Sequence, residues 1–215
     1  DMVEGELLFP TEPWEVSGSF FRQLKWASDL ITLVIERLLG FFDHVHVVGV
    51  TGNHGFIGGK SGRQHNPETN FDDLTYDRVA VRFTTNKDVS FAFNRTENER
   101  NWYLIDQVGD WRYLLVHGDQ FQISSLHSYT SIVRKVTLWH TGGLPGEVFD
   151  YILLGHWHTP TRLTINNLVL WINGTLESGN PYSKERLDAA SRPQQLLLFA
   201  HPEHGVTAEY SVYLD

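Results

Sequence analysis

The chain has 215 residues, of which 41% are hydrophobic and 20% charged, and this balance predicts one ordinary globular domain over residues 1–215. The formal net charge of -9 excludes a broad basic surface of the kind that coats nucleic acid without specificity. The absence of cysteine excludes disulfides and thiolate metal sites.

The first helix is expected over residues 17–39, where apolar residues recur at steps of three and four and form one stripe. Ser17 or Ser19 is a candidate cap for its start, and Gly40 is a candidate end. An apolar strand, Val45–Val50, follows. A helix followed by a strand is the unit from which helix-covered sheets are built.

A long polar loop is expected next, over residues 55–70, because its glycines and proline interrupt any regular structure. Loops of this length are often functional. A second helix then begins, with Thr69 or Asn70 as its cap. Asp72 and Asp73 fall in its first turn, where the helix dipole favours negative charge.

The second half of the chain alternates strands with one further helix. Strands Trp102–Val108 and Trp111–Val116 flank Gly109-Asp110, which predicts a hairpin with a two-residue turn. A helix is expected over residues 125–139, and a short apolar strand over Tyr151–Leu154. The remaining strands are separated by turns, so the C-terminal part is predicted to be largely antiparallel.

Three short strings that carry metal-binding side chains each follow an apolar strand. In open α/β sheets, sites form at the carboxyl ends of the strands. The strings are Gly52-Asn53-His54 after Val45–Val50, His117-Gly118-Asp119 after Tyr113–Val116, and Gly155-His156-Trp157-His158 after Tyr151–Leu154. Strands that deliver Asn, His and a His-x-His pair to one edge predict a metal site assembled from separate segments.

The His-x-His pair is the most informative of these strings. In an extended stretch, successive side chains point to opposite faces, so we expect His156 and His158 to share a face. Two imidazoles that project the same way suit one metal or two adjacent ones. A set of His, Asn and Asp ligands favours Mn, Fe, Zn or Ni over ions that prefer thiolate.

In this order, the strings resemble the motifs of the calcineurin-like metallophosphoesterases. The long polar loop and the C-terminal stretch that begins with Ser191-Arg192-Pro193 resemble the phage- and bacterial-type members. That family is marked by D-x-H, G-D, G-N-H, H-G and G-H-x-H, and the resemblance covers most of the chain. It implies an α/β fold, a four-layer α/β/β/α sandwich of two mixed sheets flanked by helices. The D-x-H motif is absent and Asp1 matches the second half of G-D, so we expect a chain that is incomplete at its N-terminus and lacks the first strand.

The resemblance also implies two divalent metal ions, with Mn as the first expectation and Fe, Zn or Ni as alternatives. The ligands that it implies are Asp1, Asn53, His117, His156 and His158. Asp1 would bridge the two ions, and His158 would bind the second one. Because the second ion also needs the ligands of the absent D-x-H motif, its site is expected to be weak or empty in this chain.

Three further residues are candidates for contact with the substrate. The resemblance implies that His54 contacts the phosphate and protonates the leaving oxygen, while a metal-bound hydroxide attacks phosphorus in line. The alternative is a histidine that only packs beside the site. Arg63 and His65, in the long loop, are candidate phosphate-binding residues, against the alternative of an ordinary solvated loop.

These residues predict a metal-dependent phosphoester hydrolase, most readily a phosphodiesterase acting on DNA, RNA or a nucleotide. A phosphomonoesterase or protein phosphatase is the first alternative, and a non-catalytic metal-binding remnant or subunit is the second. No apolar run is long enough to cross a membrane, so no membrane partner is expected. The lack of cysteine is compatible with a cytoplasmic location.

Overall fold

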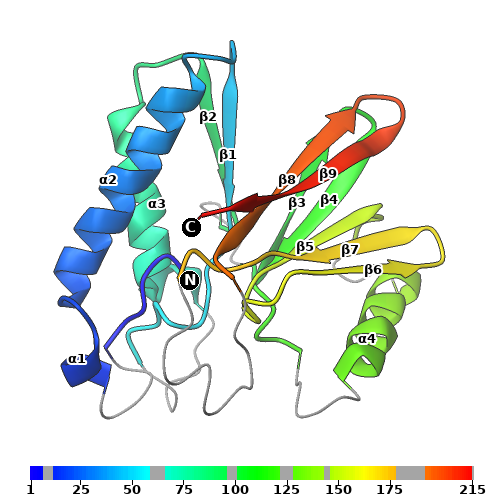
Figure 1. The fold of residues 1–215 in the computed structure, drawn as a ribbon, viewed down its shortest axis with the longest axis horizontal. Coiled ribbons are helices and arrows are strands. Elements are labelled where there is room, and N and C mark those ends of the chain that lie inside the picture. Colours follow the sequence, from blue (N-terminus) through cyan, green and yellow to red (C-terminus); the bar gives the residue numbers. More distant parts are fainter. Residues whose placement is uncertain are drawn as a thin grey trace. The chain divides into compact units, whose positions relative to one another are not determined.

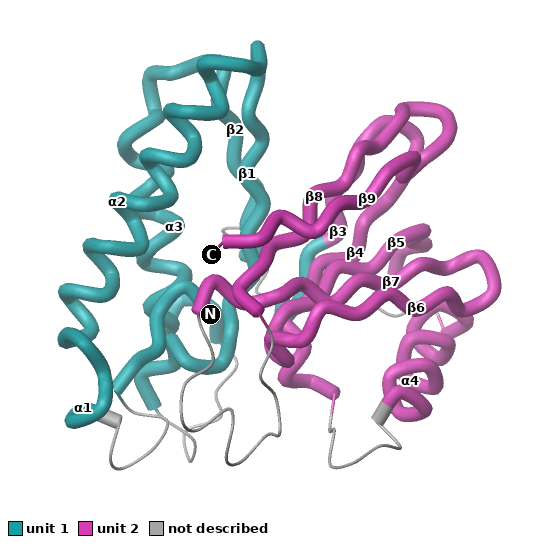
Figure 2. The backbone as a smooth tube through the Cα atoms, viewed as in Figure 1, with its two compact units in different colours: residues 1–104 teal, residues 105–215 magenta. Residues whose placement is uncertain are grey.

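The computed structural model describes residues 1–6, 12–58, 66–95, 101–121, 128–142, 146–177 and 192–214 (Figure 1). The chain divides into two compact units, which are residues 1–104 (unit 1) and residues 105–215 (unit 2) (Figure 2). Each unit has its own strands, helices and buried residues, and each is described here by itself. The single domain expected from the chain length stays a prediction.

Unit 1 is built from helices packed on a pair of parallel strands. Its elements are α1 (Glu12–Glu15), α2 (Phe20–Leu38), β1 (Val45–Gly49), the short 3-10 helix η1 (Pro67–Thr69), α3 (Phe71–Arg82) and β2 (Val89–Phe93). The two strands pair in parallel, with Val45 opposite Val89. The core joins Ile35 of α2, Val79 and Phe83 of α3, and these two strand residues. The apolar stripe predicted for the first helix therefore faces the core.

Helix α2 begins one residue after Ser19, a predicted cap residue, but the Ser19 side chain makes no capping hydrogen bond. The Glu6 carboxylate takes this role, because its Oε2 atom accepts a hydrogen bond of 3.1 Å from the Phe20 N–H. The side chain of Gln23 also bonds to both backbone groups of Gly5. The first residues of the chain are thus attached to α2 by side chains far from them in sequence.

Unit 2 contains a five-stranded mixed sheet, a helix and a hairpin. Its elements are β3 (Tyr103–Val108), which begins just before the boundary, β4 (Trp111–Val116), α4 (Ser128–Gly142), β5 (Tyr151–Leu154), β6 (Thr161–Ile165), β7 (Leu168–Ile172), β8 (Gln194–His201) and β9 (Gly205–Tyr213). The strand order is β3-β4-β5-β7-β6, and β8 pairs only with β9. Strands β4, β5 and β7 run parallel, whereas β6 is antiparallel to β7.

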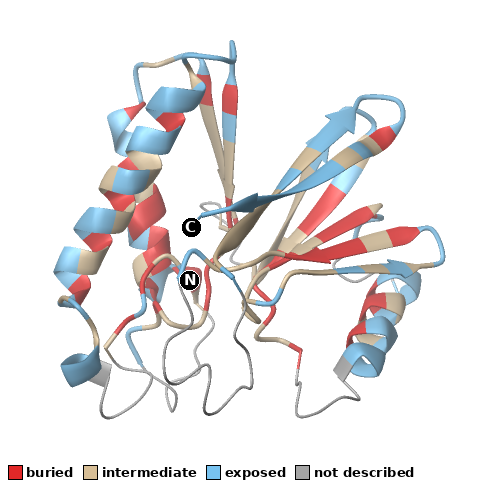
Figure 3. Cartoon of the chain, in the orientation of Figure 1, coloured by how far each residue is buried: buried red, intermediate tan, exposed pale blue. Residues whose placement is uncertain are grey.

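The aromatic residues of the sheet form the core of unit 2 on the side of the β8–β9 hairpin. Tyr113, Tyr151 and Trp171 are buried together, and Leu196 and Val206 of the hairpin pack against them. The hairpin is also held by a hydrogen bond of 3.1 Å from the Val206 N–H to the Tyr151 hydroxyl. Figure 3 shows the buried residues concentrated in the central strands of the sheet. The predicted class, mixed α/β with helices beside the sheets, is confirmed.

Among the residues that the structure describes, none of the helices combines the length and the apolar character needed to cross a membrane.

Candidate functional site

Asp1 lies against the loop that follows β1 in unit 1. Its Oδ1 atom accepts a hydrogen bond of 2.8 Å from the backbone N–H of His54. A Cβ atom added at Gly52 would lie only 2.1 Å from the same oxygen, so any side chain at this position would displace Asp1. The structure therefore brings Asp1 together with Asn53 and His54, three of the residues singled out from the sequence.

The loop after β1 is held by two side chains at the start of α3, those of Asn70 and Asp72. The Asp72 side chain, which is fully buried, accepts a hydrogen bond of 2.8 Å from the Gly52 N–H through Oδ2 and one of 2.8 Å from the Met2 N–H through Oδ1. The Asn70 side-chain amide donates a hydrogen bond of 2.7 Å to the Gly52 carbonyl oxygen. Asn70 and Asp72, here called the Gly52 clamp, thus hold both backbone groups of Gly52 and one of Met2.

The local sequence explains how the clamp is held in place. Asn70 is the N-cap of α3, as predicted, and its Oδ1 atom accepts the Asp72 N–H at 2.8 Å. The Asp72 carboxylate sits in the first turn, where the helix dipole stabilises negative charge. One turn later, the Tyr76 hydroxyl donates a hydrogen bond of 2.8 Å to the Val50 carbonyl at the end of β1. Burial, and then the charges of Asp72 and Asp73, raise the pKa of Tyr76 well above its usual value, so this donor keeps its proton.

The ring of His54 is oriented by a backbone carbonyl. Its Nδ1 atom lies 2.9 Å from the Glu4 carbonyl oxygen and 3.7 Å from the Glu4 carboxylate. A carbonyl oxygen only accepts, so Nδ1 must carry the hydrogen. With Nδ1 directed at the Glu4 carbonyl, Nε2 is the nitrogen on the other side of the ring. The side chain is 19% exposed, so part of it reaches the surface.

In unit 2, the parallel pairing of β4 and β5 brings two of the predicted ligands together. Val116 is opposite Leu154 at the carboxyl ends of these strands, so His117 and His156 leave the sheet at the same edge. The Gly155 N–H donates to the His117 carbonyl at 2.9 Å, which continues the pairing one step beyond the strands. The His117 Nε2 and His156 Nδ1 atoms lie 3.1 Å apart, and His117 is buried.

This spacing fits one divalent ion. Two imidazole nitrogens that bind the same metal at about 2.1 Å, with an angle between 90° and 109°, lie roughly 3.0–3.4 Å apart. The observed 3.1 Å falls within that range. The pair comes from two different strands, and its neutral nitrogen donors are those that Mn, Fe, Zn and Ni accept. The residues present therefore fit the predicted metal.

The backbone of the His-x-His string corrects one prediction. The extended geometry expected for His156 and His158 is wrong, because β5 ends at Leu154 and both histidines have left-handed backbones, with φ of +70° and +57°. The chain bends here as the Trp157 N–H donates to the Gly155 carbonyl at 2.8 Å, and the Trp157 ring packs on Phe121. A left-handed non-glycine residue costs about 1–2 kcal/mol, and such strain gathers at functional sites. His158 is partly buried in this bend.

The remaining candidates differ in outcome. Arg63 and His65 fall in residues 59–65, which lie outside the described residues. Asp119 interacts electrostatically with Lys135 of α4, whose pKa is lowered because burial outweighs the opposite effect of the Asp119 charge. Asp119 is part of the loop that follows β4.

Sequence reasoning missed Asp72 as part of the site, because nothing in the sequence distinguishes a buried first-turn aspartate from a solvated one. It also missed Asn173, which follows β7 at the same sheet edge as the two histidines. The Asn173 N–H donates to the Leu154 carbonyl at 2.7 Å. Its side chain is engaged with the hairpin, since it donates to Gln195 at 2.7 Å and accepts the Leu196 N–H at 2.8 Å. Asn173 therefore ties the sheet edge to β8.

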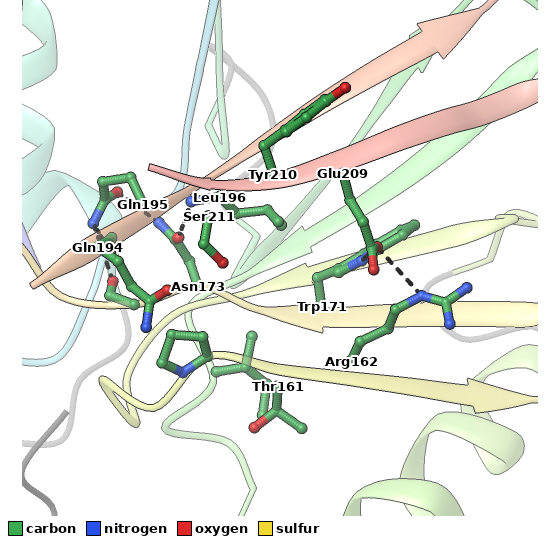
Figure 4. Close-up of a pocket in the computed structure, with 13 residues that line it drawn as sticks. Thr161, Arg162, Trp171, Asn173, Gln194, Gln195, Leu196, Glu209, Tyr210 and Ser211 are labelled. Carbon is green, nitrogen blue, oxygen red and sulfur yellow. Dashed lines mark hydrogen bonds and ion pairs between the residues drawn. The ribbon is translucent and has the colours of Figure 1, made fainter. Parts of the chain in front are cut away.

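Unit 2 also contains a pocket of about 250 Å³ lined by residues of β6, β7, β8 and β9 (Figure 4). Its charged side chains pair with each other, since the Arg162 Nε atom lies 3.3 Å from a Glu209 carboxylate oxygen. The same oxygen accepts a hydrogen bond of 2.6 Å from the Trp171 ring nitrogen. The charges in this pocket thus compensate one another, and none of the candidate metal ligands lines it.

The sequence matches no protein-family model and no curated protein. Several solved structures are similar to the chain. A Vps29 variant from Entamoeba histolytica is 14% identical, with 99% of this chain and 98% of that one covered and a TM-score of 0.44. A predicted phosphoesterase from Streptococcus pneumoniae is 14% identical, with 86% and 90% covered and a TM-score of 0.40. An archaeal phosphodiesterase is 10% identical, with 89% and 91% covered and a TM-score of 0.41. All three TM-scores are below 0.5.

Proposed function

We propose that the chain is a metal-dependent phosphoester hydrolase, and specifically a phosphodiesterase that acts on a nucleic acid or a nucleotide. The observation that carries the proposal is the His117–His156 pair, whose nitrogens lie 3.1 Å apart at the ends of two parallel strands. Of the two imidazoles, that of His117 is buried, and a buried ring nitrogen is costly unless it shares a proton or a metal with a neighbour.

The proposed ligands of two divalent ions are those that the motif resemblance assigns, namely Asp1, Asn53, His117, His156 and His158. Mn is the first choice, because the set combines nitrogen and oxygen donors without a thiolate. When bound, the ions would lower the pKa of a water molecule and neutralise the charge of the phosphate. The ligand set offers only Asp1 and His158 to the second ion, so its occupancy is expected to be the lower of the two.

His54 is proposed to protonate the leaving oxygen from its Nε2 atom. The Glu4 carbonyl holds the hydrogen on Nδ1, so the proton that is transferred must come from Nε2. The bond from the His54 N–H to Asp1 fixes the backbone of the same residue. One aspartate thereby positions the proton donor and serves as a proposed metal ligand.

The proposed substrate class rests on the net charge of the protein and on the long polar loop over residues 55–70. With a net charge of -9, the protein would attract phosphate through its metals rather than through its overall charge. Arg63 and His65 remain proposed phosphate-binding residues, and a cytoplasmic location is proposed from the lack of cysteine. A phosphomonoesterase or protein phosphatase is the alternative, since none of the candidate residues that the structure describes discriminates a diester from a monoester.

The test compares two chromogenic substrates after loading with Mn. We expect hydrolysis of bis-(p-nitrophenyl) phosphate, little hydrolysis of p-nitrophenyl phosphate, and loss of both activities in the chelator-treated protein. As a matched control, His201→Ala changes a histidine of unit 2 at the end of β8, and it should leave the rate unchanged. Hydrolysis of the monoester alone would favour the alternative enzyme class, and turnover of neither substrate by a metal-loaded protein would favour a non-catalytic subunit.

A further inference from the structure

The cavity of about 250 Å³ in unit 2, here called the hairpin pocket, has one face of strands β6 and β7 as its floor (Figure 4). Arg162 is opposite Trp171 in the antiparallel register of these strands, so the two side chains lie on the same face of the sheet. Trp171 belongs to the buried cluster against which Leu196 of the β8–β9 hairpin packs. The floor is therefore the face of the sheet that the hairpin covers.

The roof of the hairpin pocket is the inner face of the hairpin. The Glu209 carboxylate accepts a hydrogen bond of 2.6 Å from the Trp171 ring nitrogen, so Glu209 faces the sheet. Ser211 lies two residues further along β9, and Leu196 is opposite it in β8, which places both on the same inner face. Tyr210 points away from the floor (Figure 4). The pocket is thus the space between two facing β surfaces.

A glycine lets the hairpin approach the sheet at one end of this space. A Cβ atom added at Gly174 would lie 2.4 Å from the Gln194 carbonyl oxygen and 3.1 Å from the Pro160 ring. A side chain at this position would therefore push the start of β8 away from the sheet. The close approach brings Gln194 to the edge of the floor.

The charges of the hairpin pocket are already compensated within the protein. The Arg162 Nε atom lies 3.3 Å from a Glu209 carboxylate oxygen, and the Trp171 ring nitrogen donates to the same oxygen. A charged ligand would lose its hydration here without gaining an unpaired opposite charge. The pocket therefore favours an uncharged ligand.

Two polar side chains of the pocket are available to such a ligand. The amides of Asn173 and Gln195 bond to each other at 2.7 Å, so they are engaged within the protein. The side-chain amide of Gln194 and the hydroxyl of Ser211 have no hydrogen-bond partner in the part of the chain that the structure describes. Each of these two groups both donates and accepts. A ligand with donors and acceptors along its edge matches them.

The shape and size of the space favour a single planar ring system. Two packed β surfaces leave a flat gap, and Pro160, Trp171 and Leu196 give it apolar walls. Its volume of about 250 Å³ is below the roughly 300–1,000 Å³ that holds drug-sized ligands. Nucleobases are planar and uncharged, and a glutamine amide can bond to the donors and acceptors on their edges. We propose that the hairpin pocket binds a nucleobase.

This assignment rests on the proposed phosphodiesterase function and names the part of the substrate that the chain recognises. Pro160 lies two residues after His158. The Asn173 N–H donates to the carbonyl of Leu154, which lies two residues before His156. The pocket therefore adjoins the segments that carry proposed metal ligands. A base held in it orients the attached phosphate toward those ligands.

Isothermal titration calorimetry of the full chain with adenosine, guanosine, cytidine and uridine tests the pocket. These probes carry no phosphate, and EDTA is present, so metal binding does not contribute. We expect at least one nucleoside to bind, and methyl β-D-ribofuranoside, which has the sugar without the base, not to bind.

Two variants and a control assign the binding to the pocket. Ser211→Tyr places a ring in the pocket and should abolish binding. Gln194→Leu removes one hydrogen-bonding group and should weaken binding by about 3–10-fold. Val212→Tyr adds the same ring to the outer face of β9, so it is the matched control and should bind like the parent. Far-UV circular dichroism checks that each variant is folded.

A parent that binds none of the four nucleosides would overturn the proposal. Unchanged binding in Ser211→Tyr, or equal binding of the riboside, would overturn it as well. The failure of the proposed function is a different result. A protein that binds a nucleoside in the pocket but cleaves no diester after Mn loading would contradict the hydrolase alone. A protein that cleaves bis-(p-nitrophenyl) phosphate but binds no nucleoside would contradict the pocket assignment alone.

Discussion

His54→Gln is expected to lower the turnover number of the Mn-loaded protein for its diester substrate by about 10²–10⁴-fold, the usual contribution of a positioned proton donor. Glutamine retains a hydrogen-bond donor near the Glu4 carbonyl but has no group that releases a proton at neutral pH. The backbone N–H that binds Asp1 is unaffected by the change of side chain. The metal content should therefore stay at the level of the parent while the rate falls.

The measurement is a steady-state rate profile combined with elemental analysis of the same samples. His44→Gln is the matched control, because His44 pairs with Ser90 at the opposite end of β1. This control should keep both the rate and the metal content. A His54→Gln variant with the parent's rate would contradict the assigned role, and a variant that loses its metal would move His54 into the ligand set.

Asp72→Ala is expected to lower the free energy of unfolding by about 2–4 kcal/mol, because it leaves the buried N–H of Gly52 and the partly buried N–H of Met2 without their acceptor. The loop that carries Asn53 and His54 would then lose half of its clamp. Asp72→Asn keeps one of the two acceptor oxygens, so we expect this variant to be more stable than Asp72→Ala. Its folded fraction should still show a reduced kcat.

Urea unfolding followed by circular dichroism measures the stability, and rates at saturating substrate measure kcat. The control is Asp77→Ala, one turn away on α3, where the half-exposed carboxylate pairs with Arg95. Exposed ion pairs contribute roughly 0–1 kcal/mol, so this variant should change little. If Asp72→Ala were as mild as Asp77→Ala, the clamp would not hold the loop.

The positions of the ligand-bearing strands could be predicted because two physical signals coincide in them. Strand β5 was expected over Tyr151–Leu154 and observed there, since a short apolar run ends where glycine and polar residues begin. The hairpin at Gly109 followed from its two-residue turn, and Gly109 has the positive φ of +61° that this turn uses. The proximity of His117 and His156 then follows from parallel pairing, which no single strand reveals.

Other features depend on contacts between residues distant in sequence, and local patterns do not carry them. The cap of α2 is Glu6 rather than a nearby serine, because an acidic side chain from a separate segment reaches the helix start. At His156 the chain bends and Trp157 packs on Phe121, whereas the alternation of side chains along a strand predicts an extended chain. Asp72 was visible only as a first-turn acid, although its partners lie 20 and 70 residues away.

The metal content of the Mn-loaded protein tests the central claim most directly. Elemental analysis should compare the parent with Asn53→Ala from unit 1, His156→Ala from unit 2, the double variant and the control His201→Ala. We expect at least one ion per chain in the parent and in the control, a clear loss in each single variant, and no further loss in the double variant, since both residues are proposed ligands of the same ion. A parent without bound metal, or variants that bind as much Mn as the parent, would contradict the account.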